Sequence, residues 1–161
     1  EPLPPAPTSD AVLACHQGDA GACRAAGERL LQRKDPQAAM ALYAKGCAAK
    51  DAACCAGAGV AADQLTLRTP TARNRQIALA WHDKACARKD AGGCHRAAAA
   101  VLVGGKDTGR AVRLALAACE LGDCRDCRLL AGTLVSNLTA EQKQRVHGWL
   151  GSCPAETPAG R

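Results

Sequence analysis

The sequence has almost no aromatic side chains: its 161 residues include no Phe, one Tyr and two Trp. Such a chain has few large groups with which to fill a thick core, and single-stranded nucleic acid would find almost no surface for stacking its bases. A long hydrophobic run is also missing, since no segment approaches the roughly 20 apolar residues that cross a bilayer. We therefore expect thin layers of closely packed helices, because alanine is the best helix former and takes little space.

Charge of one sign is not concentrated either. The formal net charge is +6, and the basic residues are scattered along the chain instead of forming one block. We expect no nucleic-acid partner and no membrane-spanning segment. Residues 1–10 (EPLPPAPTSD) resemble a proline-rich tether left after processing, so we expect a mature exported protein. Whether that tether carries a lipid stays open, and residues 154–161 are expected to form a disordered tail.

Cysteine, by contrast, is abundant, with eleven residues that indicate an oxidising compartment. Eight of them form a pattern of Cys, three residues, Asp, three residues, Cys, which occurs four times, centred on Asp19, Asp51, Asp90 and Asp123. Residues eight apart in one helix are separated by about 12 Å, whereas a disulfide tolerates about 7 Å between Cα atoms. If the pairs are bridged, the chain must reverse at each Asp and form a helical hairpin.

The four units recur at helical-repeat spacing, because their first cysteines at 15, 47, 86 and 119 are 32, 39 and 33 residues apart. This predicts an all-α, right-handed αα-hairpin solenoid over residues 11–136. We expect the longest interval to hold a longer connection near residues 63–75. A capping helix is predicted over residues 137–153, where Thr139 and Gln142 fit a capping box.

Local signals place several helix ends. The first unit should open at Ser9 or Asp10 and run to His16, and the third should end near Val103, before two glycines. The second helix of the fourth unit is expected to include Leu134.

The units also resemble a known family. Segments such as AAMALYAKGCAAKDAACC at 38–55 and IALAWHDKACARKDAGGC at 77–94 are similar to Sel-one-like repeats, which are relatives of tetratricopeptide repeats. They look most like the disulfide-bridged branch found in cysteine-rich proteins of Helicobacter. The resemblance covers roughly residues 11–136 and implies an αα-solenoid with one disulfide per hairpin, in a periplasmic or secreted protein.

With one bridge in each hairpin, the expected disulfides are Cys15–Cys23, Cys47–Cys55, Cys86–Cys94 and Cys119–Cys127. The capping helix should run antiparallel to the helix before it, which would bring Cys153 near Cys124 for a fifth bridge. Cys54 is then left over. It is interpreted as a free buried thiol or, alternatively, as an intermolecular or regulatory cysteine.

No metal or cofactor is expected from the sequence. Zinc sites use cysteine pairs two to four residues apart, whereas seven residues separate each pair here, and the four histidines are dispersed. Cys124 and Cys127 form a C-x-x-C sequence, but the βαβ frame of a redox motif is missing.

An enzyme is not expected either. The family has been linked to penicillin binding and weak β-lactamase activity, which is therefore an alternative function. Serine acylation of that type needs a lysine three residues after the serine. Here Ser9, Ser136 and Ser152 are followed at that distance by valine, threonine and alanine.

The expected function is that of a non-catalytic scaffold or adaptor, which binds a protein or peptide on a concave face lined mainly by the first helix of each hairpin. Helix phase suggests six partner-binding residues: Tyr43, Lys45, Trp81, His82, Lys84 and Arg113. An equally good interpretation is that Lys45, Lys84 and Arg113 are ordinary solvated surface residues that bind no partner. A further alternative is a structural subunit of an envelope complex. The expected location is periplasmic, outer-membrane-tethered or secreted.

Overall fold

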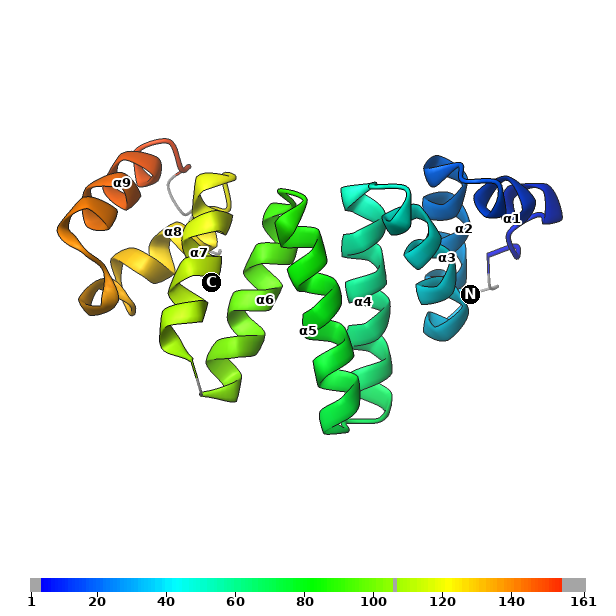
Figure 1. Cartoon of the computed structure of the whole chain (residues 1–161), viewed down its shortest axis with the longest axis horizontal. Helices are drawn as coiled ribbons and strands as arrows, with labels where there is room; N and C mark the ends of the chain where they lie inside the picture. Colours follow the sequence, from blue (N-terminus) through cyan, green and yellow to red (C-terminus); the bar gives the residue numbers. More distant parts are fainter. Residues whose placement is uncertain (1–3, 106, 155–161) are drawn as a thin grey trace, which may run out of the picture.

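The computed structural model describes residues 4–105 and 107–154, and these ranges are built from helices. The helices are α1 (Ser9–His16), α2 (Ala20–Gln32), α3 (Pro36–Ala48), α4 (Ala52–Arg68), α5 (Ala72–Ala87), α6 (Ala91–Gly104), α7 (Thr108–Glu120), α8 (Cys124–Ala131), the 3₁₀ turn η1 (Val135–Asn137) and α9 (Ala140–Leu150). Each helix packs chiefly against its neighbours in sequence. Figure 1 shows the result, with the helices following one another along the long axis of the molecule. The expected all-α, solenoid-like architecture is confirmed.

One turn geometry joins the two helices of every hairpin. In the first hairpin the N–H of Gly18 donates to the Cys15 carbonyl at 3.0 Å, and the N–H of Asp19 donates to the Ala14 carbonyl at 3.0 Å. This is a Schellman ending, in which the residue before Asp adopts a left-handed conformation. The positive φ angles are 99° at Gly18, 69° at Lys50, 64° at Lys89 and 94° at Gly122.

The aspartate that completes this ending also begins the next helix. The side chain of Asp19 accepts the N–H of Ala22, three residues on, and Asp51 and Asp90 cap α4 and α6 in the same way, whereas Asp123 caps α8 by accepting the N–H of Arg125, two residues on. Such a cap stabilises a helix by about 1 kcal/mol. One residue therefore closes one helix and opens another, which is why the two cysteines that flank it face each other.

Five disulfides join the cysteine pairs that were expected. The four hairpin bridges have Cα separations of 4.4 to 4.8 Å. Cys124 is bonded to Cys153 across 5.7 Å, which ties the segment after α9 to the start of α8. Each hairpin bridge is expected to contribute about 2–3 kcal/mol to stability in the chain-entropy model. The bridges also indicate an oxidising compartment.

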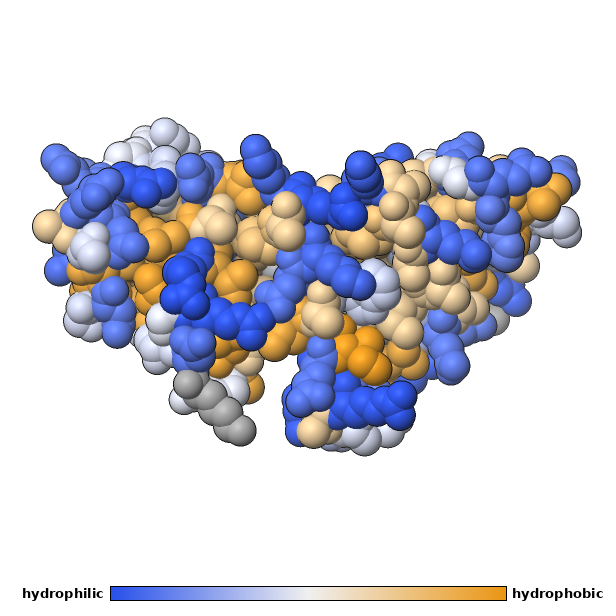
Figure 2. Space-filling view, in the orientation of Figure 1, coloured by the Kyte–Doolittle hydropathy of each residue, from blue (hydrophilic) through white to orange (hydrophobic). Residues whose placement is uncertain are grey.

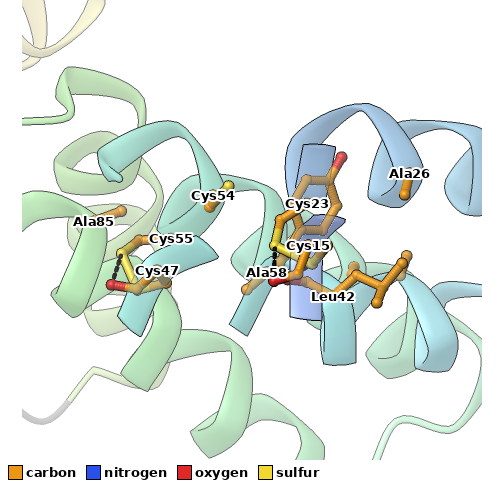
Figure 3. Packing of buried hydrophobic residues seen from close by; sticks show 12 residues of the cluster. Cys15, Cys23, Ala26, Leu42, Cys47, Cys54, Cys55, Ala58 and Ala85 are labelled. Atoms are coloured by element: carbon orange, nitrogen blue, oxygen red, sulfur yellow. Dashed lines mark hydrogen bonds between the residues drawn. A yellow bond between two sulfur atoms is a disulfide. The ribbon is translucent and has the colours of Figure 1, made fainter. Parts of the chain in front are cut away.

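Small side chains form the core, as the shortage of aromatics predicts. Most of its buried residues are alanine or cysteine, and Figure 3 shows two of the bridges within this packing. Leu42 and Tyr43 are the larger side chains buried in the N-terminal cluster, and Tyr43 packs against Gly27 and Gly57. A Cβ atom on Gly27 would lie 2.7 Å from the tyrosine ring, so a glycine is required there.

Two predictions about helix ends are wrong. Residues 63–75 are not a long connection: α4 continues to Arg68 and α5 begins at Ala72, leaving three linking residues. Thr71 caps α5 by accepting the N–H of Asn74, so the extra residues of this interval lengthen two helices. Leu134 lies outside α8, which ends at Ala131 before the Gly132 cap, although its side chain is buried.

The other predicted ends agree with the structure. Helix α1 begins at Ser9, α6 ends at Gly104 before a left-handed Gly105, and the capping box of Thr139 and Gln142 is formed. The helix predicted over residues 137–153 is shorter, as α9 covers Ala140–Leu150. Of the tether and tail, residues 1–3 and 155–161 lie outside the described ranges. No described helix has the length and apolar character that spanning a membrane requires.

Candidate functional site: an arginine-lined groove

A groove of about 1040 Å³ lies where the lengthened helices α4 and α5 face α6 and the start of α7. In Figure 2 the molecule is hollowed at its lower edge, between the end of the α4–α5 pair and the end of α6. Asp63, Thr66, Leu67, Arg75 and Gln76 line one side. The first four belong to the segment 63–75 that the sequence had suggested was a connection, so the long interval between repeats supplies a wall of the groove.

Arginine is the main charged residue of the groove. Four helices contribute one each: α5, α6, α7 and α8 supply Arg75, Arg96, Arg110 and Arg125. Two aspartates, Asp63 and Asp107, are also in the lining. Because guanidinium groups match carboxylates in shape and charge, this surface is suited to acidic groups.

Three of the arginines are held by carboxylates. Arg96 lies 3.3 Å from Asp63, Arg125 lies 2.6 Å from Asp123, and Arg110 pairs with Asp83. These arginine side chains are 38–64% exposed. The pairs of Arg96 and Arg110 are partly exposed at both partners and contribute only about 0.2–1 kcal/mol, so an incoming carboxylate can compete for these two arginines.

Arg75 is the fourth. Within the described ranges it has no carboxylate partner and donates to the Pro70 carbonyl at 3.1 Å.

Apolar groups lie beside these charges. Leu67 near the end of α4 is 83% exposed and Val103 near the end of α6 is 90% exposed, and both line the groove. Alanines 99 and 100 provide a further small apolar surface on α6. The groove thus offers hydrophobic contacts and arginine donors to the same ligand.

Two histidines of the lining are paired with aspartates. His82 is buried, and its Nε2 lies 3.0 Å from the Asp63 carboxylate, while its Nδ1 faces Gly59. A Cβ on Gly59 would collide with the imidazole, so this glycine makes room for the buried ring. His82 therefore has a structural role in joining α5 to α4.

The second pair is His95 with Asp126, at 2.6 Å between Nδ1 and Oδ2. Asp126 is only 1% exposed, and burial raises the pKa of its carboxyl, partly offset by the hydrogen bond from His95. Neighbouring Asp123 behaves differently: burial acts to raise its pKa, but hydrogen bonds from Arg125 outweigh burial and lower it. One ligand atom each from His95, Asp123 and Asp126 lie within 4.8 Å of one another.

The six residues suggested from helix phase do not gather at one place. Only His82 lines the groove. Tyr43 is buried in the N-terminal core, and burial raises its pKa to about 12. Trp81 packs partly buried against the same core, with the Lys84 ammonium 4.2 Å from its ring centroid. Lys45 and Arg113 are exposed outside the groove lining.

Cys54 is a free thiol and is completely buried. Its Sγ donates to the Ala20 carbonyl at 3.4 Å and packs against Gly46. Figure 3 shows it beside both N-terminal bridges. Burial raises the pKa of the thiol to about 12, with a further contribution from its hydrogen bond to Asp51. Within the single chain Cys54 is thus a free buried thiol, as the first of the two interpretations expected.

Comparison with known proteins gives no assignment, since no family model and no curated protein matches the chain. The three serines considered for acylation are far from one another in sequence, at the start of α1, in η1 and after α9, and none lines the groove.

The sequence pattern did not reveal the groove because its walls come from three hairpins. The one feature of the sequence that could have indicated the groove is the lengthened interval between Cys47 and Cys86.

Proposed function

We propose that the chain is a non-catalytic binding module that holds an extended, acidic segment of a partner protein in the arginine-lined groove. The observation that carries this proposal is the joint presence of four arginines and two highly exposed apolar side chains around one groove. An extended segment that alternates carboxylates with apolar residues can meet both surfaces at once. Its affinity would come from desolvated apolar contacts and its specificity from the guanidinium groups.

The resemblance of residues 11–136 to Sel-one-like repeats supports the same proposal, because stacked helical hairpins commonly present grooves to peptides. That resemblance, together with five disulfides, favours a periplasmic, outer-membrane-tethered or secreted location. A nitrocefin assay tests the non-catalytic part, since hydrolysis above the buffer background would contradict it.

The groove is tested by fluorescence anisotropy with a labelled peptide of alternating glutamate and leucine. We expect saturable binding that weakens as salt rises from about 0.01 M to about 0.15 M, which shortens the Debye length from about 30 Å to about 8 Å. A second peptide, in which lysine replaces glutamate, serves as the charge-reversed control. Equal affinity for the two peptides would contradict the proposal.

Variants locate the binding surface. Arg75→Ala and Arg96→Ala are each expected to weaken binding about tenfold, because a hydrogen bond to a charged group contributes about 1.5 kcal/mol. The matched control is Arg113→Ala, which removes an exposed arginine of α7 outside the groove lining. If Arg113→Ala weakens binding as much as the groove variants do, the ligand lies elsewhere.

A further inference from the structure

Three side chains that could hold a metal ion meet at the edge of the groove. His95 comes from α6, Asp123 is the N-cap of α8, and Asp126 lies in the first turn of α8. One ligand atom from each falls within 4.8 Å of the other two. One imidazole and two carboxylates are a ligand set that suits zinc, which accepts nitrogen and oxygen donors at similar distances.

Asp126 provides an independent indication that a ligand belongs here. Its side chain is 1% exposed, and its Oδ1 has no hydrogen-bond partner within residues 4–105 and 107–154. The other oxygen of this carboxylate, Oδ2, contacts His95 Nδ1. The unpaired Oδ1 therefore belongs to the same carboxylate that faces the imidazole. A buried carboxylate with an unsatisfied oxygen is unfavourable unless a proton, water or cation completes it.

Comparison of the four repeats shows that the fold does not require a carboxylate at this place. The residue just before the second bridging cysteine is Ala22, Cys54 and Gly93 in the first three hairpins, and Asp126 in the fourth. All of the first three are small and uncharged. The first three hairpins therefore pack with an uncharged residue at this position. Packing alone does not explain why the fourth has an aspartate, Asp126.

The local charges are compatible with a divalent cation. Arg125 Nη2 lies 2.6 Å from Asp123 Oδ2, and the arginine side chain is 64% exposed. The same guanidinium also donates its Nε–H to Asp123 Oδ1 at 3.0 Å, so zinc has to displace two side-chain hydrogen bonds of Arg125 before Asp123 Oδ2 becomes a ligand. Asp123 Oδ1 would still accept the backbone N–H of Arg125 and so continue to cap α8. Two carboxylates then balance the two charges of the ion.

We propose that His95, Asp123 and Asp126 form a Zn²⁺ site at the edge of the groove. Three protein ligands leave at least one position for water or for a carboxylate of a groove ligand. His95 and Arg125 both line the groove, so this open position is reached from it. The site does not depend on the proposed function, because its ligands bind the ion whether or not the groove holds a peptide.

Zinc binding to the full chain is measured by isothermal titration calorimetry and by metal analysis after equilibrium dialysis against ZnCl₂. We expect one Zn²⁺ per chain and a rise in melting temperature with zinc concentration. His95→Gln and Asp126→Asn should each abolish the bound ion. The control is His147→Ala, which removes an exposed histidine of α9 and should retain one Zn²⁺. Absence of binding to the wild type, or full binding by His95→Gln, would overturn the proposal.

A fourth variant tests whether Asp123 binds zinc or serves only as the partner of Arg125. Arg125→Ala removes the cation that competes for Asp123, so it should tighten zinc binding severalfold. If it leaves zinc affinity unchanged or weakens it, Asp123 is not a ligand. Circular dichroism of every variant verifies folding, and two substitutions at different ligands guard against the loss of one variant through misfolding.

Discussion

Cys54 and Asp126 occupy the same position in their repeats, since each stands immediately before the second cysteine of a hairpin bridge. Each is also buried against the preceding hairpin, where Cys54 meets the Ala20 carbonyl and Asp126 meets His95. The same interface therefore holds a neutral thiol in one repeat and a carboxylate in another. The energetic consequences of that exchange can be measured.

In the metal-free protein, Asp126→Ala is expected to change the free energy of unfolding by no more than about 1 kcal/mol, because it removes a buried group that is only partly satisfied. The reverse change, Cys54→Asp, places a carboxylate where none is accommodated and should destabilise by about 3 kcal/mol. Urea unfolding monitored by circular dichroism in the presence of a chelator gives both values. A large loss of stability in Asp126→Ala would show that the His95 pair is an important structural contact.

The Cys54 thiol is expected to be inert in the folded protein. Its Sγ is shielded from solvent, so Ellman's reagent should detect no thiol in the native state and one per chain in guanidinium without reductant. Ordinary alkylation of the native chain at neutral pH would mean that this part of the fold opens readily.

The thiol should also influence stability in alkaline solution. Its pKa is raised in the folded state from 9.0 to about 12, so the unfolded chain ionises first as pH rises. The stability that wild type holds over Cys54→Ala is complete below pH 9.0 and should decline as pH increases toward 12. Urea melts of the two proteins at matched pH values measure this difference, to which Tyr43 also contributes because Cys54 helps to raise its pKa. A difference that grows with pH would contradict the raised pKa.

Two of the hairpin turns contain a lysine where the backbone favours glycine. Lys50 and Lys89 have φ angles of 69° and 64°, whereas glycine stands at the equivalent place in the other two turns. We expect Lys50→Gly and Lys89→Gly each to stabilise the protein by about 0.5–1 kcal/mol, since a left-handed residue with a Cβ is strained. The reciprocal control, Gly18→Ala, should destabilise by a similar amount. Thermal melts of the oxidised proteins decide between these signs.

Reduction is expected to unfold the chain at 37 °C. Each of the five bridges contributes about 2–4 kcal/mol in the chain-entropy model. Together they are comparable to, or larger than, the free energy of unfolding of a whole domain, which is typically about 5–15 kcal/mol. The core cannot replace them, because it is composed mostly of alanine and cysteine. Circular dichroism with and without a reductant tests this. Unchanged helix content and an unchanged melting temperature after complete reduction would show that the bridges are dispensable.

Much of the fold could be predicted because its determinants are local. The Asp caps, the glycines of two turns and the eight-residue cysteine spacing act within a few residues, and the pairing of Cys124 with Cys153 followed from a helix that folds back. The end of α4 was missed because Leu65, Thr66 and Leu67 are compatible with either a helix or a linker. Only the cap at Thr71 resolves that ambiguity.

The groove and the cluster of His95 with Asp126 could not be derived in the same way. Their members come from different hairpins, and contacts between hairpins depend on the angle at which each one packs on the next. A periodic pattern fixes which face of a helix is buried, but not which side chains meet across an interface. Tyr43 illustrates the limit: it shares the helix face of Ala39 and Cys47, which predicts burial, but the space that holds its ring is made by Gly27 and Gly57 of other helices.

The hairpin bridges also determine how the chain would respond to mechanical force. Each joins residues only eight apart, so none of these three bridges links one hairpin to the next, and only the backbone does so. A molecule pulled from its ends could separate hairpin by hairpin while every bridge stays intact. Each closed loop would withhold about 27 Å of contour length, at about 3.4 Å per residue. Under tension the protein would extend as a string of small locked loops, and the Cys124–Cys153 bond would hold its last helices together.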